Sequence, residues 1–478
     1  MHLLVIGGSD GGISAALRAR ELDPDVAITV MLTDAYPNFS ICGIPYYLSG
    51  DVADWRNLAH RTRADIEGLG ITVLTDTTAQ HIDVAAHQVT ATTLRGTEIQ
   101  LRYDRLVVAT GAVPVRPPID GLERLGPAGG VHLLHTMADT HAVMDTLTRR
   151  EVSSAVIVGA GYIGLELAEA LVARGIAVTE VEALPRVLPT LDPELGQRVA
   201  DRLADHNVAV RTATRVTDVG ATGRRLTVRA SDAGSGQVFE QPTDMVLVVT
   251  GVSPDTALAA RAGIPLARNG AICVDRRMAT SAPDVYAAGD CVVTHHVLLG
   301  ETYLPLGTTA HKQGRVAGEN ALGGERRFAG SLGTQVVKVF DLVAARTGLR
   351  DHEAVAARYQ PVTVASTADD HKAYYPGART QSTSASPATS APAGCSACRW
   401  SGRSRRPSTN GSTRRPLPSS AASTSTSSAT STSPTPRPSA ARGTYSRLPH
   451  SAGPLLHALE GTATPRLGGR SGALTSAS

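Results

Sequence analysis

Two segments of the chain share one arrangement, in which an apolar run leads into a glycine-rich turn and then into a helical pattern. The first turn reads Gly7-Gly8-Ser9-Asp10-Gly11-Gly12, and the second, some 150 residues later, reads Gly159-Ala160-Gly161-Tyr162-Ile163-Gly164. A continuous apolar run suits a strand buried on both faces of a parallel sheet. Glycines that open the following helix are typical of dinucleotide-binding units. The sequence therefore predicts an α/β protein with two doubly wound nucleotide-binding domains.

The first turn departs from the dinucleotide pattern at one position. Gly7 is expected to form the tight turn and Gly12 to let the helix pack closely on the strand, but Ser9 stands where the middle glycine belongs. A ribose-binding acid is expected about 20 residues further on; Leu32 has the nearest register, and Asp34 is the closest carboxylate. The alternative to a dinucleotide-binding loop is an ordinary glycine turn before a helix. The remaining residues of the predicted loop are Gly8 and Gly11.

The second turn matches the full pattern through Gly159, Gly161 and Gly164, with Ile163 beside them. A pyrophosphate can then approach the backbone at the helix N-terminus. Glu182 follows at the end of the next apolar run, where a carboxylate accepts the ribose 2′-hydroxyl and repels a 2′-phosphate. The sequence therefore favours NADH over NADPH, although Arg186 lies close enough to weaken that preference.

Cys42 lies between these turns, in the segment Asn38-Phe39-Ser40-Ile41-Cys42-Gly43-Ile44-Pro45-Tyr46-Tyr47. With this cysteine, residues 1–378 resemble the flavin-dependent pyridine nucleotide–disulfide oxidoreductases, in the single-cysteine branch of coenzyme A–disulfide reductases and NADH oxidases and peroxidases. Two-cysteine relatives carry a second cysteine five residues later, where this chain has Tyr47. Cys42 is therefore expected to rest as a mixed disulfide with a small thiol or as a sulfenic acid. A helix N-terminus and the flavin are expected to stabilise its thiolate, whereas a buried, inert cysteine is the alternative.

The resemblance implies bound FAD and further cofactor residues. In relatives, the aspartate of Ala287-Ala288-Gly289-Asp290 binds the flavin ribitol, and the segment Leu306-Gly307-Thr308-Thr309-Ala310 lies beside the flavin. The other turns that match the family are Thr110-Gly111 and Gly251-Val252-Ser253-Pro254. By the same resemblance, electrons pass from NADH through the flavin to Cys42 and then to a disulfide.

Asp10 separates the two chemistries of the branch. Oxidases and peroxidases resembling this chain have a histidine at that position, whereas a carboxylate disfavours a nearby thiolate and lacks the titration range of imidazole. We therefore expect reduction of a small-thiol disulfide. A NADH oxidase or peroxidase that uses a Cys42 sulfenic acid is the alternative, and a flavin-binding protein without turnover is another.

The disulfide itself is not specified by the sequence. Asn38 and Ser40 are expected to face the substrate, and Arg18 and Arg20 can hold the phosphates of a coenzyme A-like ligand. Alternatively, both arginines are solvated charges on the surface of the helix and bind no ligand. Reductases of this kind have an asparagine just before the cysteine, where this chain has Ile41.

The composition changes sharply near Arg379. Residues 379–478 are mostly Ser, Thr, Ala, Pro and Gly, with twelve arginines against one acidic residue, Glu460, so the body of the chain is acidic. We expect this tail to be disordered. With GC-rich codons, residues 432–445 can be back-translated so that a displaced frame reads LAYTPPLGSPWDV, and the same displacement works for residues 379–399. We infer a one-nucleotide frame slip near Arg379 that removes the later part of the interface domain.

The expected organisation is a first FAD-binding part over 1–112, an NAD(H)-binding domain over 113–244, a second FAD-binding part over 245–330, a partial α+β interface domain over 331–378 and the tail over 379–478. In relatives the interface domain forms a homodimer, and Tyr374 or Tyr375 matches a tyrosine that reaches the partner's active site, with strand packing as the alternative. We expect dimerisation to be impaired, with exposed sheet edges on residues 331–376.

Several other classes are disfavoured. No apolar run is long enough to span a bilayer, the N-terminus has no secretory signal, and five cysteines in 478 residues do not make a disulfide scaffold. We therefore expect a cytoplasmic enzyme without a membrane or a specific nucleic-acid partner. The pair Cys395 and Cys398 has no second ligand pair, so we expect no metal site.

Overall fold

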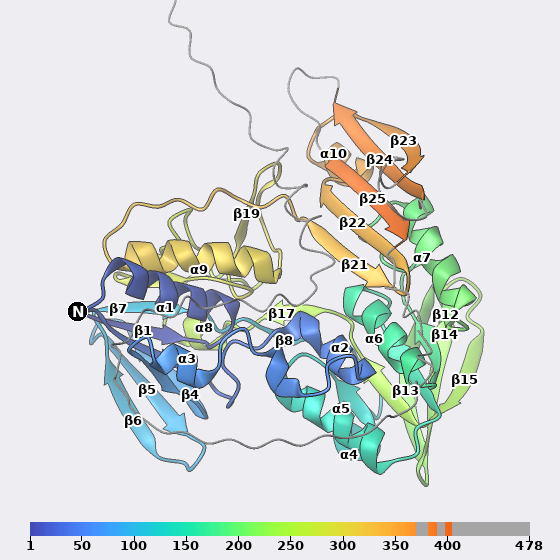
Figure 1. Cartoon of the computed structure of the whole chain (residues 1–478), viewed down its shortest axis with the longest axis horizontal. Coiled ribbons are helices and arrows are strands. Elements are labelled where there is room, and N and C mark those ends of the chain that lie inside the picture. Colours follow the sequence, from blue (N-terminus) through green and yellow to red (C-terminus); the bar gives the residue numbers. More distant parts are fainter. Residues whose placement is uncertain (370–380, 390–396, 404–478) are drawn as a thin grey trace, which may run out of the picture. The chain divides into compact units, whose positions relative to one another are not determined.

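A computed structural model of the chain describes residues 1–369, 381–389 and 397–403. Its first parallel sheet has the strand order β18-β7-β1-β2-β3 (Figure 1). The central strands β1 (His2–Ile6) and β7 (Arg105–Val108) are almost wholly buried, as expected for apolar runs covered on both faces. The other strands of this sheet are β2 (Ala27–Met31), β3 (Ile71–Leu74) and β18 (Val285–Ala287).

Two long helices, α1 (Asp10–Leu22) and α9 (Gly307–Ala321), lie side by side against this sheet (Figure 1). They approach closely because small residues line their contact. A Cβ added at Gly314 would lie 2.1 Å from the Gly11 carbonyl oxygen, and one at Gly318 would lie 2.2 Å from the Ala15 carbonyl oxygen. The start of the chain and residues about 300 positions later are thereby brought together.

The second parallel sheet has the order β12-β11-β10-β16-β9. Strand β10 (Ser154–Val158) leads through the second glycine turn into α6 (Tyr162–Ala173) and then β11 (Ala177–Val181). Strand β16 (Met245–Val248) pairs with β10, so the predicted boundary at residue 244 is too early. The reason is that the antiparallel sheet β13-β14-β15 is inserted before the chain returns to its parent sheet. The remaining strands are β9 (Val131–Leu133) and β12 (Ala209–Arg211).

The two parallel sheets are connected by a pair of short antiparallel strands, β8 (Ala112–Pro114) and β17 (Val252–Pro254). The other strands outside these sheets are β4 (Thr77–Asp83), β5 (Gln88–Thr93), β6 (Glu98–Arg102), β13 (Thr214–Thr222), β14 (Arg225–Asp232), β15 (Val238–Thr243), β19 (Thr294–His296) and β20 (Gly300–Thr302). The shorter helices are η1 (Ile41–Gly43), α2 (Ile44–Ser49), η2 (Trp55–Leu58), α3 (Arg63–Glu67), α4 (Leu122–Gly129), α5 (Met137–Arg149), α7 (Pro193–Asp205) and α8 (Ala257–Arg261).

The third sheet corrects the expectation for the tail. Its order is β21-β22-β25-β24-β23, so β24 (Gln381–Thr389) and β25 (Ala397–Arg403) extend a sheet begun by β21 (Gln335–Val339) and β22 (Leu342–Gly348). Composition missed these strands because sheet pairing uses backbone groups and needs no long apolar run. The last elements are α10 (Asp351–Ala356) and β23 (Pro361–Asp369). The rest of the predicted tail (379–380, 390–396 and 404–478) lies outside the described residues.

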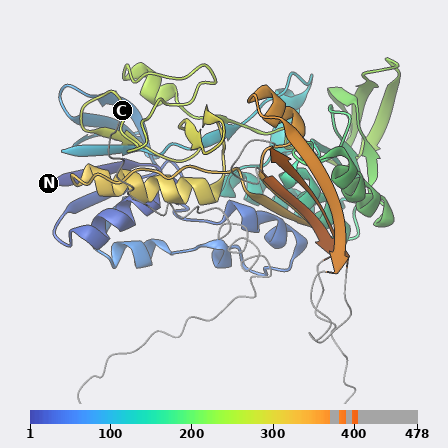
Figure 2. The same ribbon diagram turned by 90° about the horizontal axis from the view of Figure 1, so that it is seen from above.

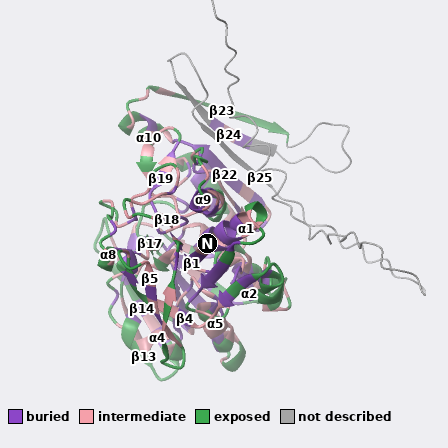
Figure 3. Ribbon diagram, turned by 90° about the vertical axis from the view of Figure 1, so that its left-hand side faces the viewer, coloured by how far each residue is buried: buried purple, intermediate pink, exposed green. Residues whose placement is uncertain are grey.

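Strand β23 forms an edge of this sheet and is exposed along nearly its whole length (Figures 2 and 3). Val362 and Val364 are 59% and 61% exposed. An exposed edge is therefore present on residues 361–369, as expected, although the sheet keeps strands that the sequence interpretation had removed. Among the described residues, no helix is long and apolar enough to cross a membrane.

Candidate functional site: two glycine loops and Cys42

The first glycine loop requires glycine at its two predicted key positions. Gly7 has a φ of +122°, and a Cβ there would lie 1.9 Å from the Ala109 carbonyl oxygen. A Cβ at Gly12 would lie 2.0 Å from the Gly7 carbonyl oxygen. Ser9 caps α1 without a side-chain hydrogen bond to the helix, so its hydroxyl does not occupy the N-terminal N–H groups. The loop therefore leaves its backbone available to a phosphate.

Asp34, the carboxylate predicted to bind a ribose, is hydrogen-bonded within its own turn. The Asp34 carboxylate accepts a hydrogen bond of 2.9 Å from the Tyr36 backbone N–H, and burial raises the pKa of Asp34. Leu32 packs directly on the loop, since a Cβ at Gly8 would lie 2.7 Å from its Cδ1. An apolar side chain therefore occupies the register where the acid was expected, and Asp34 stabilises its own turn.

Other predicted cofactor residues converge on the start of α1. The Gly289 N–H donates to Gln313 Oε1 at 3.0 Å, and a Cβ at Gly289 would lie 3.8 Å from the Gly11 Cα. Asp290 follows and is half-buried, and desolvation and then the charge of Asp10 raise its pKa to about 6. At the start of α9, a Cβ at Gly307 would lie 2.7 Å from Asp10 Oδ2, and Thr308 is the next residue.

The turn after β7 is hydrogen-bonded to the segment that directly follows β17. The Thr110 hydroxyl donates to the Asp255 carbonyl oxygen at 2.5 Å. Gly111 and Gly251 both have positive φ values, and no atom lies within 4 Å of a Cβ built on either. These two glycines therefore border open space, into which a ligand can reach.

The second glycine loop has the geometry that its sequence predicts. Gly159 has a φ of +111°, and a Cβ at Gly164 would lie 2.0 Å from the Gly159 carbonyl oxygen. Gly161 caps α6 and has nothing within 4 Å of a built Cβ. The Glu182 carboxylate accepts from the Ala160 and Leu184 N–H groups at 2.7 and 2.8 Å. This carboxylate is therefore fixed beside the loop, while Ile163 packs against the core.

Cys42 lies in η1, and its side chain is exposed. The segment before it is tied to the first glycine loop, because the Asn38 N–H donates to the Gly8 carbonyl oxygen at 2.7 Å. The side chain of Asn38 is buried, and its Oδ1 has no hydrogen-bond partner in the described part of the chain. Ser40 is held in turn by the Leu58 carbonyl oxygen, which accepts from its N–H at 2.8 Å. These contacts fix the backbone of the segment that leads into Cys42.

The polypeptide around Cys42 raises the pKa of its thiol. Enclosure by the surrounding protein, although the sulfur reaches solvent, raises the pKa of Cys42 to about 11, with further contributions from Glu166, Asp10 and Asp290. Desolvation is the largest of these causes, and the three carboxyl groups add to it. Among the described side chains, Cys273 and Cys291 are also free thiols, and Cys291 is fully buried, as expected for a core residue.

Two groups of the site were missed in the sequence, one whose charge acts on Cys42 and one that lies beside Asp10. Glu166 lies on α6, where burial, and then the charge of Glu169, raise its pKa to about 8. His311 on α9 lies with Nε2 3.5 Å from Asp10 Oδ1. Glu166 comes two residues after the last glycine of the second glycine loop, in Gly164-Leu165-Glu166. This position in the sequence could have identified it as a site residue. His311 had no such signal, because it is distant in sequence from Asp10.

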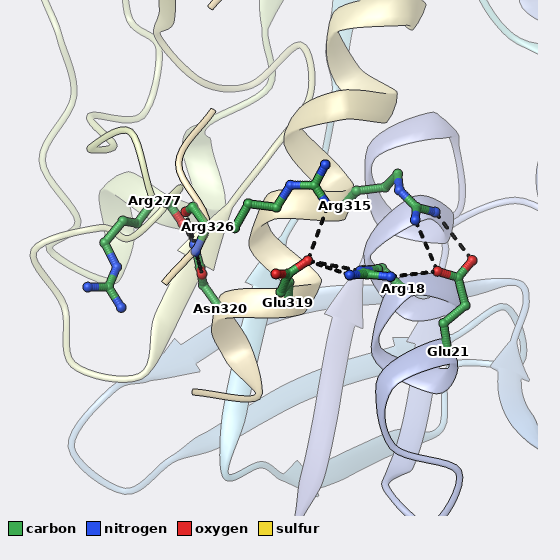
Figure 4. Close-up of polar contacts among 7 residues, drawn as sticks. All are labelled: Arg18, Glu21, Arg277, Arg315, Glu319, Asn320 and Arg326. Carbon is green, nitrogen blue, oxygen red and sulfur yellow. Dashed lines mark hydrogen bonds and ion pairs between the residues drawn. The ribbon is translucent and has the colours of Figure 1, made fainter. Parts of the chain in front are cut away.

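The two arginines predicted to bind substrate make contacts within the protein. Arg18 donates to Glu319 Oε2 at 2.7 Å and to Glu21 Oε2 at 3.1 Å (Figure 4). Arg20 donates to the Gly70 carbonyl oxygen at 2.9 Å. Phosphate binding by either arginine would compete with these contacts. Tyr374, Tyr375 and Cys395 lie outside the described residues, and no group of three or more metal-ligating side chains occurs in the described ranges.

Comparison with known proteins agrees with this geometry. A family model described as pyridine nucleotide-disulphide oxidoreductase matches residues 1–314. The chain is 33% identical over 382 residues to an NADH oxidase of Methanocaldococcus jannaschii, covering 79% of this chain and 83% of the relative. It is 34% identical over 380 residues to a CoA-dependent NAD(P)H sulfur oxidoreductase of Pyrococcus furiosus, with the same coverage.

A solved structure is similar over most of the described chain. It is a NAD-dependent persulfide reductase from A. fulgidus, with a TM-score of 0.78 and 37% sequence identity. The match covers 85% of this chain and 74% of that one. The fold class and the family resemblance predicted from the sequence are thereby confirmed.

Proposed function

Because the chain belongs to the pyridine nucleotide-disulphide oxidoreductase family, we propose that it passes electrons from NAD(P)H, by way of FAD and Cys42, to a small-thiol disulfide. The observation that carries this proposal is the cysteine loop. Cys42 is exposed on a segment hydrogen-bonded to the first glycine loop. Tyr47 stands five residues later, where two-cysteine relatives carry the second cysteine. The relatives named above act, by their names, as an NADH oxidase, a sulfur oxidoreductase and a persulfide reductase.

The residues present fit FAD. Close approach of backbone at Gly7 and Gly12 forms the turn, Asn38 has a buried oxygen without a hydrogen-bond partner among the described residues, and Asp290 is a half-buried carboxyl on which the charge of Asp10 acts. FAD bound there would be held by the first glycine loop, by Asp290 and by the start of α9 at Gly307. When bound, FAD supplies a two-electron acceptor for hydride and a donor to sulfur.

The second glycine loop suits NADH. Gly161 leaves the N-terminus of α6 open, and Glu182 is fixed beside it by two backbone N–H groups. A carboxylate at this place favours a free ribose hydroxyl over a phosphate. We therefore propose that NADH is preferred over NADPH.

Cys42 performs the sulfur chemistry in this proposal. Its sulfur attacks the S–S bond of the substrate, which forms a mixed disulfide and releases one thiol. Two electrons that originate from NAD(P)H then cleave the mixed disulfide, release the second thiol and return the cysteine. The balance is one disulfide, one NAD(P)H and one proton consumed for two thiols and one NAD(P)⁺ released. Because burial, and then the surrounding carboxyl groups, raise the pKa of Cys42, the thiol must lose a proton before its sulfur attacks.

A second function has a specific observation in its favour. The sequence argued against oxygen or peroxide chemistry because position 10 lacks an imidazole, but His311 places one 3.5 Å from Asp10. An NADH oxidase or peroxidase that cycles Cys42 through a sulfenic acid is therefore the alternative. Release of free thiol, measured against consumption of oxygen or peroxide at equal NADH oxidation, separates the two.

The test of the main proposal is the variant Cys42→Ser. Reduction of bound flavin by NADH should persist, whereas disulfide-dependent turnover should fall to background, because serine forms no mixed disulfide. Cys273→Ser serves as the matched control, since that free thiol belongs to neither glycine loop nor to the cysteine loop and should be dispensable. Disulfide turnover by Cys42→Ser at the parent rate, or a purified chain that takes up no FAD, would overturn the proposal.

Assembly and location are part of the same proposal. We propose a cytoplasmic enzyme whose family-type homodimer forms poorly, because the chain beyond residue 403 departs from the composition of an interface domain. Size-exclusion chromatography that gives a stable dimer at micromolar concentration would contradict the poor dimerisation.

A further inference from the structure

The second glycine loop is fastened at its start to β11. The Gly159 N–H donates to the Val181 carbonyl oxygen at 2.8 Å, and the Ala160 N–H donates to Glu182 Oε2 at 2.7 Å. The other oxygen of this carboxylate accepts from the Leu184 N–H at 2.8 Å. Glu182 is therefore a carboxylate whose two oxygens are both paired.

A second carboxyl group, that of Glu180, lies under the end of the same loop. Glu180 and Glu182 are two residues apart on one strand, so their side chains point to the same face of the sheet. One Glu180 oxygen lies 2.9 Å from the position of a Cβ built on Gly164, in the first turn of α6. Glu180 has no exposed surface, and neither of its oxygens has a hydrogen-bond partner among the described residues. The carboxyl group thus packs against the turn without receiving an N–H from it.

The setting of Glu180 favours its neutral form. A buried charge is costly unless it is paired and hydrogen-bonded, and Glu180 has neither kind of support. Burial, and then the charge of Glu182, raise the pKa of Glu180 to about 8. Its ionisation therefore occurs in a range of pH that binding experiments can reach.

The elements packed against Glu180 bring no charge that offsets its ionisation. The residues paired with it across β10 and β12 are Ile157 and Val210, which do not titrate. Among the described residues, the charge that acts on Glu180 is that of Glu182. The titratable side chains of α6 and β12 interact elsewhere: Tyr162 with Thr190, Glu166 with Glu169 and Lys338, and Arg211 with the Phe239 ring.

We infer that Glu180 must carry its proton for the second glycine loop to bind a dinucleotide. This inference rests on the proposed use of NADH. The free N–H groups and the dipole of α6 attract a pyrophosphate to the first turn. An ionised Glu180 under that turn opposes this attraction, because Coulomb interactions are strong in a buried setting. By reciprocity, a bound dinucleotide favours protonated Glu180, and the proton comes from the buffer.

The affinity test uses the oxidised, flavin-loaded chain and NAD⁺, which has the pyrophosphate of NADH and delivers no hydride. Isothermal titration calorimetry gives Kd from pH 6.5 to 9. Because Glu180 ionises at about pH 8, the parent Kd should rise by about tenfold from pH 7 to pH 9. Glu180→Gln keeps the size of the side chain and cannot ionise, so its Kd should change by less than about twofold over this range.

The matched control is Glu151→Gln. Glu151 is an exposed carboxylate just before β10, whereas the loop follows the other end of that strand. This variant loses one carboxylate of the same domain without changing the loop, so its Kd should follow the parent profile.

Proton uptake tests the inference in the parent chain alone, so no variant has to fold. Heats of NAD⁺ binding at pH 8, measured in buffers that differ in ionisation enthalpy, give the protons taken up per dinucleotide bound. We expect about half a proton for the parent, because half of the free chains are ionised at Glu180 at this pH. Glu180→Gln should take up none.

A parent Kd that stays constant from pH 7 to pH 9 overturns the inference, as does a Glu180→Gln profile that matches the parent or an absence of proton uptake at pH 8. A role of Glu180 in packing alone would change Kd equally at every pH. A chain that binds no NAD⁺ at any pH gives a different result, since it removes the proposed use of NADH and this inference with it.

Discussion

A carboxyl group buried under the second glycine loop gives a prediction whose sign and size follow from the structure. Glu180, in β11, has no exposed surface, and neither of its oxygens has a hydrogen-bond partner among the described residues. One oxygen lies 2.9 Å from a Cβ built on Gly164. Burial, and then the charge of Glu182, raise the pKa of Glu180 to about 8 from a reference value of 4.5. The folded chain therefore keeps this carboxyl group protonated at neutral pH.

The consequence for stability has a definite direction. Between pH 4.5 and 8 the folded state holds a proton at Glu180 that the unfolded state has released. The free energy of unfolding therefore falls as pH rises, at about 1.4 kcal/mol per pH unit from this one group. Between pH 5 and pH 7 the loss amounts to about 3 kcal/mol.

The substitution Glu180→Gln removes this titration while keeping the size of the side chain. The free energy of unfolding of the variant minus that of the parent should increase by about 3 kcal/mol from pH 5 to pH 7. Urea unfolding followed by circular dichroism at pH 5, 6 and 7 measures it, and contributions from groups common to both chains cancel. Glu194→Gln, at an exposed carboxylate at the start of α7, should show no such increase. A difference between Glu180→Gln and parent that stays constant over this range would refute the reasoning.

Three further predictions concern the loops and the tail. Gly12→Ala places a methyl group 2.0 Å from the Gly7 carbonyl oxygen, so the purified variant should lack the visible absorption of flavin; a yellow protein with parent flavin content would contradict the assignment of this loop. Glu182→Ala removes the fixed carboxylate, so KM for NADH in flavin reduction should rise by about 10- to 100-fold, the effect of one lost charged hydrogen bond. The ratio of NADH to NADPH efficiency should fall with it, and an unchanged ratio would show that Glu182 does not select the nucleotide. Resequencing of the gene should reveal a one-nucleotide difference from neighbouring strains near the codon for Arg379, and a frame identical to theirs would remove the frame-slip hypothesis.

Much of the fold could be predicted from local pattern. The turns at Gly7 and Gly159 each need a backbone conformation that favours glycine, and the apolar runs before them can only be buried. Such requirements act over a few residues and are therefore visible in the sequence. The third sheet was less accessible, because the strands over 381–389 and 397–403 are joined to it by backbone pairing, to which serine and threonine contribute as well as valine does.

The amino-acid sequence by itself determined the two nucleotide-binding units and the lone cysteine between them, because those features depend on neighbouring residues along the chain. Only the tertiary structure decided the electrostatic setting of Cys42. Burial raises the pKa of Cys42, and Glu166, Asp10 and Asp290, which come from three separate parts of the chain, raise it further. The same holds for His311 beside Asp10. Coulomb interactions depend on distance in space, so groups hundreds of residues apart act on one sulfur only after the helices have packed.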